Sequence, residues 1–220
     1  NIAIANKDFG ILMYGEGKSL VNLFISDLIK SGVFKPEEEL SFVPSFSNRL
    51  DRNTMGLVVG CKNAEALRLV NKAFKDRQID KGYKALVKGS MKDKITINEG
   101  LIYGANNTVK VDKSPSAKES LTLVKPLKEG KNYSLVEVDL ITGRKHQIRV
   151  HLSHIGHPIL GDRKYGQGED LTSYGLKGQY LIANKLAFKE MDGVLSYLNG
   201  KEFILDDSKY IDLENDCLNM

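Results

Sequence analysis

Apolar and polar residues alternate along several short stretches of the chain, a pattern typical of β-strands with one buried face. The clearest alternation is at residues 83–89, where Gly89 ends it. Residues 55–60 are almost continuously apolar, which indicates a buried strand. The other strands predicted in this way are residues 2–5, 120–124, 133–140, 180–188 and 203–205.

Three further stretches carry apolar residues at the spacing of a helix face. Ser19 and Asn63 are expected to cap the first two helices, because their side chains can accept hydrogen bonds from free backbone N–H groups. The first helix should end at Gly32, and the third should begin after Gly143. The residues expected on the core faces are Leu20, Leu23, Phe24 and Leu28; Leu67, Val70 and Phe74; and Ile148, Leu152 and Ile155.

The order of these elements favours an α+β fold, because strands follow one another without regular βαβ alternation. Residues 92–117, rich in Lys, Asn, Gly and Ser, are expected to add short hairpins with exposed loops. With 220 residues, of which 41% are apolar, the chain can bury a substantial core as one large domain or two closely packed lobes.

Composition disfavours a membrane or secreted protein. No apolar run approaches the roughly 18 residues of a membrane span, and no secretory leader opens the chain. Cys61 and Cys217 lie far apart, which argues against a disulfide or metal framework and for the cytoplasm. The first residue is Asn rather than Met, which fits a piece of a longer protein.

The net charge of +4 is unevenly distributed. Residues 206–220 hold five acids and one Lys, so their charge of −4 leaves +8 on residues 1–205. We therefore expect a basic body, residues 1–205, and an acidic C-terminal tail, residues 206–220. A basic body fits a polyanion partner, although ordinary soluble enzymes also carry modest positive charge.

The densest basic region, between residues 140 and 166, holds five Lys or Arg, all four histidines and one acid, Asp162. A helix that begins after Thr142 and Gly143 would add free N–H groups and partial positive charge, which together suit phosphate groups. The alternative is a solvated basic helix face.

Neither a metal nor a cofactor is expected. His151, His154 and His157 are evenly spaced, but steps of three residues turn successive side chains around a helix, whereas a metal needs converging ligands. The chain has no dinucleotide-binding motif, and the short Gly15-Glu16-Gly17 segment does not make a phosphate loop.

Asp51 is the most informative acid, because it stands between Arg49 and Arg52 just before the apolar strand at residues 55–60. An Asp with a reference pKa of about 3.9 is ionised at neutral pH, and flanking Arg charges favour the ionised form. Such a carboxylate can act as a nucleophile or as an ion-pair partner. The alternative is an ordinary surface Arg/Asp cluster.

Three segments resemble, in this order, motifs of the RluA family of pseudouridine synthases, which isomerise uridine in ribosomal and transfer RNA. They are residues 49–56, residues 81–89 and residues 142–151, followed by a further match at residues 156–162. The match spans most of residues 2–205 and favours the branch that acts on large-subunit ribosomal RNA. The third segment is highly specific.

The resemblance implies a catalytic domain, residues 1–205, built on a mixed, mostly antiparallel sheet flanked by helices, with an active-site cleft across its middle. It implies an isomerase that needs no cofactor. The expected partner is RNA, ribosomal before transfer RNA, with no membrane, and the protein is expected to be a monomer. The S4-type RNA-binding domain that family members often carry at the N-terminus is not visible in this sequence.

The resemblance also implies roles for single residues. Asp51 is the expected nucleophile, attacking C1′ of the ribose or C6 of the uracil, and Arg149 is expected to pair with it. Tyr83 would stack on the base and can receive the C5 proton; a half-buried strand aromatic is the alternative. Arg49 would fill the space left by the flipped nucleotide, and Leu181 would form an apolar wall of the base pocket. The other expected RNA contacts are Arg52, Arg144, Lys145, His146, Gln147 and Ile148.

The chain departs from the family pattern near the nucleophile. Asn48 stands where His is usual, Asn53 where an acid is usual and Met55 where Ser is usual. These changes leave open a catalytically silent RNA-binding protein of the same fold, acting for example in ribosome assembly. A nucleoside hydrolase would need a second carboxylate, but Asp139 and Asp162 are interpreted as strand-end and turn residues.

Overall fold

The computed structural model describes residues 1–105 and 108–220 and divides them into two compact units. Unit 1 comprises Asn1–Asp80 and Lys185–Leu205, and unit 2 comprises Lys81–Asn184 and Asp206–Met220. Two of the boundaries fall within strands β4 (Ile79–Lys88) and β10 (Leu181–Phe188), and the third lies between Leu205 and Asp206. Residues 106–107, within the predicted hairpin region, lie outside the described residues.

Unit 1 is built around β3 (Met55–Cys61), whose seven residues are all buried. In the strand order of the sheet, β3 stands between β1 and β10. The pairing of β1 with β3 is antiparallel, with Ile2 opposite Cys61 and Lys7 opposite Gly56. The other elements of unit 1 are β1 (Ile2–Lys7), α1 (Leu20–Lys30), β2 (Ser45–Phe46), α2 (Ala64–Lys75), η2 (Gly193–Leu198) and β11 (Glu202–Ile204).

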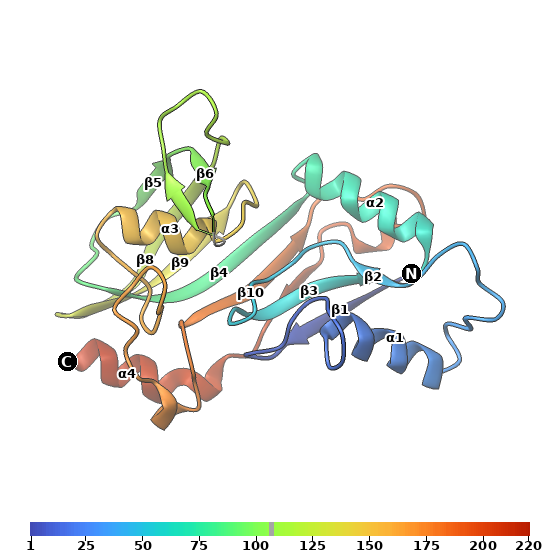
Figure 1. Ribbon diagram of the computed structural model, residues 1–220, viewed down its shortest axis with the longest axis horizontal. Helices are drawn as coiled ribbons and strands as arrows, with labels where there is room; N and C mark the ends of the chain where they lie inside the picture. Colours follow the sequence, from blue (N-terminus) through green and yellow to red (C-terminus); the bar gives the residue numbers. More distant parts are fainter. Residues whose placement is uncertain (106–107) are drawn as a thin grey trace. The chain divides into compact units, whose positions relative to one another are not determined.

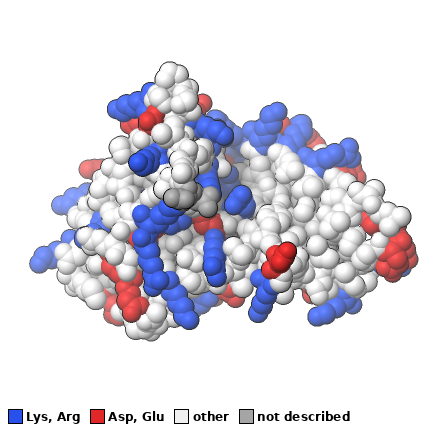
Figure 2. All heavy atoms as spheres, viewed as in Figure 1, with Lys and Arg blue, Asp and Glu red and all other residues white. Residues whose placement is uncertain are grey.

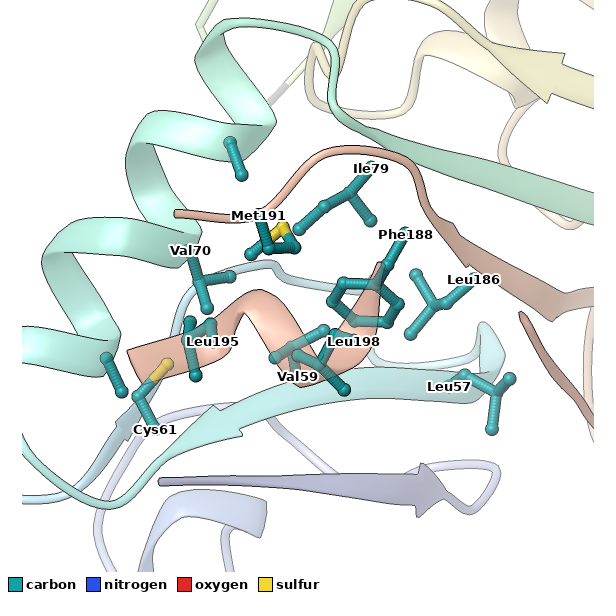
Figure 3. Close-up of a cluster of buried hydrophobic side chains, with 12 residues drawn as sticks. Leu57, Val59, Cys61, Val70, Ile79, Leu186, Phe188, Met191, Leu195 and Leu198 are labelled. Carbon is teal, nitrogen blue, oxygen red and sulfur yellow. The ribbon is translucent and has the colours of Figure 1, made fainter. Parts of the chain in front are cut away.

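The core of unit 1 forms where α2 and η2 cover β3 and β10. Figure 3 shows Val70 from α2, Leu195 from η2 and Val59 from β3 coming together, with Phe188 of β10 beside them. Three of these side chains are fully buried, and Phe188 is 1% exposed. Burial of this apolar surface is the main stabilising contribution in unit 1.

Unit 2 is a mostly antiparallel sheet that carries α3 (Gln147–His154). Strand β4 pairs with β9, β9 with β8 and β8 with β5, all antiparallel. Helix α3 lies against β8 and the β6–β7 hairpin (Figure 1), and Val150 packs on Leu101 and Val109 of that hairpin. The further elements are β5 (Ile95–Asn98), β6 (Leu101–Tyr103), β7 (Val109–Val111), β8 (Leu121–Glu129), β9 (Tyr133–Leu140), η1 (Thr172–Tyr174), η3 (Ser208–Tyr210) and α4 (Ile211–Asn219).

Most predicted elements are confirmed, including the α+β class and the mostly antiparallel sheet. Ser19 and Asn63 cap α1 and α2 as expected, each accepting a bond from the backbone N–H three residues later. One core residue was wrong, because Leu23 is 43% exposed. The third helix begins at Gln147, three residues after the expected start at Arg144, because residues 142–146 form a loop instead.

The segment predicted as an acidic tail folds as η3 and α4 within unit 2. Leu213 and Cys217 are four residues apart, share a helix face and are buried. The prediction of an acidic tail relied on the number of acids and overlooked this apolar helix face. Among the described residues, no helix is long and apolar enough to cross a membrane.

We predict that Phe188→Ala will destabilise unit 1 by about 3–5 kcal/mol, because a large buried ring is lost and a cavity remains. Denaturant unfolding monitored in unit 1 would measure the change. Tyr197→Ala is the matched control, since Tyr197 is 48% exposed. Equal losses in the two variants would contradict the assignment of the core.

Candidate active site

The loop that carries Asp51 precedes β3 and is held at several points within unit 1. The Thr54 N–H donates to the Asp51 carbonyl at 3.0 Å and closes a turn. Before the turn, the Val59 N–H donates to Asn48 Oδ1 at 2.8 Å. Asn48, the departure from the family pattern, therefore ties the loop to β3 by its side chain.

Lys7 also holds this loop. The sequence analysis did not identify Lys7 as part of the site. Its side chain is fully buried at the end of β1. The ammonium Nζ donates to the carbonyls of Asp8 at 3.0 Å, Ile11 at 2.9 Å and Arg52 at 2.9 Å. Three donors meet three acceptors, so the ammonium group is satisfied by backbone alone. The last of these bonds fixes the residue next to Asp51.

Burial lowers the pKa of Lys7 to about 8, although the negative charges of Asp51 and Asp8 act in the opposite direction. The ammonium is thus a positive charge close enough to Asp51 to interact with it.

Arg149 lies in unit 2 on α3 and is held by a buried acid, Asp162. Its Nε donates to Asp162 Oδ2 at 2.8 Å and its Nη2 to Asp162 Oδ1 at 2.9 Å. Arg149 is 9% exposed and Asp162 is fully buried. The pair is bidentate, which fixes the position and the rotation of the guanidinium.

Asp162 also shapes the turn that follows it. Burial would raise its pKa, but hydrogen bonds and charge from Arg149, with the backbone N–H groups of Lys164 and Tyr165, hold the pKa of Asp162 below its usual value. Those two N–H groups donate to Oδ1 at 2.9 Å and 3.1 Å. The turn interpretation of Asp162 is confirmed, but its pairing with Arg149 was missed. Its being the only acid between residues 140 and 166 was the available signal.

Tyr165 connects Arg149 to His146. The guanidinium carbon of Arg149 lies 5.0 Å from the Tyr165 ring centroid, within the range of a cation–π contact. The Tyr165 hydroxyl lies 2.7 Å from His146 Nδ1. His146 has φ 55°, which is uncommon for a residue other than glycine and is held here by this contact at the start of α3.

Gln147 and Ile148 face the interior of unit 2. The Gln147 amide nitrogen donates to the Leu121 carbonyl and Thr122 Oγ1, and its oxygen accepts from Thr142 Oγ1 and the Arg144 N–H. These four bonds fix the loop before α3. Ile148 is 4% exposed. Both residues have structural roles, and RNA contact by either stays a prediction.

The remaining expected site residues divide between the units. Arg49 and Arg52 are exposed in unit 1, and Arg144 is exposed in unit 2. Arg52 Nε donates to the Gly10 carbonyl at 3.1 Å and Arg144 Nε to the Glu119 carbonyl at 3.2 Å. Lys145 is half-buried in unit 2. Figure 2 shows Lys and Arg side chains gathered over the segment of unit 2 that links α3 to β10.

Tyr83 and Leu181 both lie in unit 2, on neighbouring strands β4 and β10. They are 5% and 3% exposed. The pairing of Asp51 with Arg149 and the cleft across the middle of the sheet stay predictions.

Two further histidines have hydrogen-bond partners within unit 2. His151 is buried, with Nδ1 2.9 Å from Thr122 Oγ1 and Nε2 3.0 Å from the Glu99 carbonyl. Burial lowers its pKa. His157 Nδ1 lies 2.8 Å from the Lys88 carbonyl. Within the described part of the chain, no group of three or more His, Cys, Asp or Glu is arranged to hold a metal ion.

We predict that Lys7 makes stability rise with pH in alkaline solution. An unfolded Lys has a pKa of about 10.4, and the folded Lys7 has a pKa of about 8. Between these values the unfolded chain binds more protons, so the Lys7 contribution to the free energy of unfolding increases as pH rises from about 8 to about 10.4. Measured across this range, the free energy of unfolding of wild type should increase relative to that of Lys7→Met as pH rises.

The exposed Lys18 provides the control. The difference in the free energy of unfolding between wild type and Lys18→Met should not change with pH over the same range. A wild-type advantage over Lys7→Met that stays flat from pH 8 upward contradicts the role given to burial.

The sequence and fold were compared with known proteins. The family model described as RNA pseudouridylate synthase matches residues 1–154. A relative from Mycoplasma capricolum, named an uncharacterised RNA pseudouridine synthase, is 37% identical over 212 residues, which cover 93% of this chain and 68% of the relative. One from Helicobacter pylori with the same name is 38% identical over 141 residues, covering 64% of this chain and 57% of the relative.

The fold has solved counterparts. The human RNA pseudouridylate synthase domain-containing protein 4 superposes with a TM-score of 0.77 at 21% identity, covering 99% of this chain and 90% of that one. The chain spans only about three-fifths of some curated relatives, 62% of a Mycoplasma genitalium protein and 57% of the Helicobacter pylori one. Because the family model covers well over half of the described chain, the protein belongs to the RNA pseudouridylate synthase family.

Proposed function

We propose that this chain isomerises uridine to pseudouridine in RNA, with Asp51 as the nucleophile. Family membership carries the proposal, because the matched residues 1–154 include Asp51, Tyr83 and Arg149. The chemistry is an isomerisation. The bond between N1 and C1′ breaks, C5 bonds to C1′, the C5 proton is lost and N1 gains a proton.

The surroundings of Asp51 support this role. Its loop is held by Asn48 and Lys7, and the ammonium of Lys7 is close enough to interact with the charge of Asp51. Attack on C1′ or on C6 both require a charged, oriented oxygen. A loop whose backbone is fixed orients that oxygen before substrate binds, which lowers the entropic part of the barrier.

In unit 2, we assign to Arg149 the task of pairing with Asp51 in the reacting complex. Asp162 accepts bonds from Nε and Nη2 of Arg149 and so holds the guanidinium in a fixed orientation. Tyr83 is assigned to the base as a stacking partner and acceptor of the C5 proton, and Leu181 as an apolar wall. Base flipping costs a few kcal/mol, which phosphate contacts from basic residues can offset.

For the substrate, we propose large-subunit ribosomal RNA within the RluA branch of the family. The overall resemblance to the family favours this branch, and the basic body of the chain suits a folded, highly charged RNA. Chemical mapping of pseudouridine in ribosomal and transfer RNA after incubation with the protein would separate the two substrates.

We predict that Asp51→Asn will abolish pseudouridine formation, because an amide cannot act as the charged nucleophile. RNA affinity should stay within about tenfold of wild type, since phosphate contacts supply most of it. Chemical mapping of modified sites and a binding titration measure the two effects.

Asp8→Asn is the matched control, since Asp8 is exposed and also interacts with the charge of Lys7. It should keep activity. Turnover by Asp51→Asn would remove the nucleophile assignment. Free uracil from wild type would indicate a hydrolase, and binding without any change in the RNA would indicate a silent module.

We also predict that Arg149→Lys will lose at least about tenfold more kcat than Arg144→Lys. Lys keeps the charge but cannot make the planar bidentate contact that Asp162 accepts from Arg149. Arg144 is exposed and bonds one carbonyl, so it tolerates the exchange. Steady-state kinetics on RNA measure the difference in kcat. Equal losses in the two variants would show that the ion pair with Asp51 has been assigned to the wrong arginine.

A further inference from the structure

A buried polar cluster in unit 2 lies outside the residues discussed so far. Glu214 of α4 is 2% exposed and accepts hydrogen bonds from the Tyr180 hydroxyl, which is fully buried. The same carboxylate lies 2.6 Å from the Lys84 ammonium, which also contacts Asp207 at 3.0 Å. We call Lys84, Tyr180, Asp207 and Glu214 the α4 cluster.

Two members of this cluster are direct sequence neighbours of the proposed base contacts. Lys84 follows Tyr83 in β4, and Tyr180 precedes Leu181, the first residue of β10. Successive side chains of a strand point to opposite faces, so Lys84 reaches α4 from the face of the sheet opposite Tyr83. Strands β4 and β10 are neighbours in the sheet. One carboxylate of α4 therefore bonds β4 through Lys84 and the residue just before β10 through Tyr180, in each case next to a residue assigned to the base.

The charges of the cluster make these bonds strong. Burial lowers the pKa of Lys84, but hydrogen bonds and charge from Glu214 and Asp207 outweigh it and raise that pKa, so the ammonium stays protonated. Hydrogen bonds to charged groups contribute more than neutral ones, and a buried partner left unpaired is costly. Strands bonded in this way resist displacement.

Apolar and aromatic packing fixes α4 itself. Leu213 and Cys217 are buried, and the Tyr210 ring meets the Tyr180 ring edge to face at 5.6 Å. At the far end of the helix, the Asn132 side chain donates to the Met220 carbonyl at 2.8 Å. The helix is therefore a rigid support for Glu214.

We propose that Glu214, acting through Lys84 and Tyr180, is a positioning residue that holds Tyr83 and Leu181 in place for the uracil. The inference rests on the proposed function. It extends the functional part of the chain to α4, which lies beyond the matched residues 1–154. The α4 cluster touches neither base nor ribose; it fixes the backbone from which the two base contacts project.

The test compares Glu214→Gln and Tyr180→Phe with Asp216→Asn. Asp216 is on the same helix and accepts a 2.7 Å bond from the Tyr174 hydroxyl, but that bond is exposed and leads to η1, not to β4 or to the residue before β10. We expect kcat to fall about tenfold in the first two variants, because small displacements of reacting groups slow the reaction strongly. RNA affinity should change less than about twofold, since phosphate contacts are intact. Asp216→Asn should match wild type.

Hydrogen exchange of peptides that contain residues 81–86 and 179–184 provides a readout independent of activity. Exchange there should be faster in Glu214→Gln and Tyr180→Phe, and unchanged in β3. Unchanged exchange, or a folded variant with the kcat of wild type, overturns the inference. Wild type that makes no pseudouridine overturns the proposed function itself, while exchange still reports whether the cluster holds the strands.

Discussion

The buried ion pair of Arg149 and Asp162 is the constraint around which unit 2 is arranged. A buried guanidinium costs several kcal/mol unless it is paired and hydrogen-bonded. Asp162 provides that pairing, so the turn that carries it must keep its shape. Gly161 shows how tight the turn is, because it has φ 76° and a Cβ there would lie 2.5 Å from the Gly178 carbonyl oxygen. The geometry of a turn thus fixes a side chain on a helix.

Unit 1 solves the same problem with a different cation. Lys7 has a compact ammonium, and three backbone carbonyls surround it where a planar guanidinium would take a carboxylate. Because one of these carbonyls belongs to Arg52, the charge also organises the loop of Asp51. In each unit a buried cation forms its hydrogen bonds with groups from loops. These bonds restrict the conformations that the loops can adopt.

Local sequence signals predicted the elements well. The apolar run of β3 and the caps at Ser19 and Asn63 depend on residues close together in the sequence, so they can be predicted from the sequence alone. The buried charges were not predictable, because Lys7 meets its third acceptor 45 residues away. Asp162 was interpreted as a turn residue, since the turn is local and the bond to Arg149 is not. The candidate residues were thus recognised by motif, and their supports required the fold.

The C-terminal segment shows why charge counts mislead. Five acids and one Lys suggested an acidic tail, yet Glu214 is almost completely buried, with Lys84 and Tyr180 as its partners. Burying an acid costs less free energy when such donors surround it, and composition does not show whether they do. In the proposed reaction, the detached uracil must turn within its pocket and react again without escaping. Such chemistry depends on a pocket whose walls stay in place. In our inference, a helix from outside the matched region supplies that rigidity, because it is bonded to β4 and to the residue just before β10.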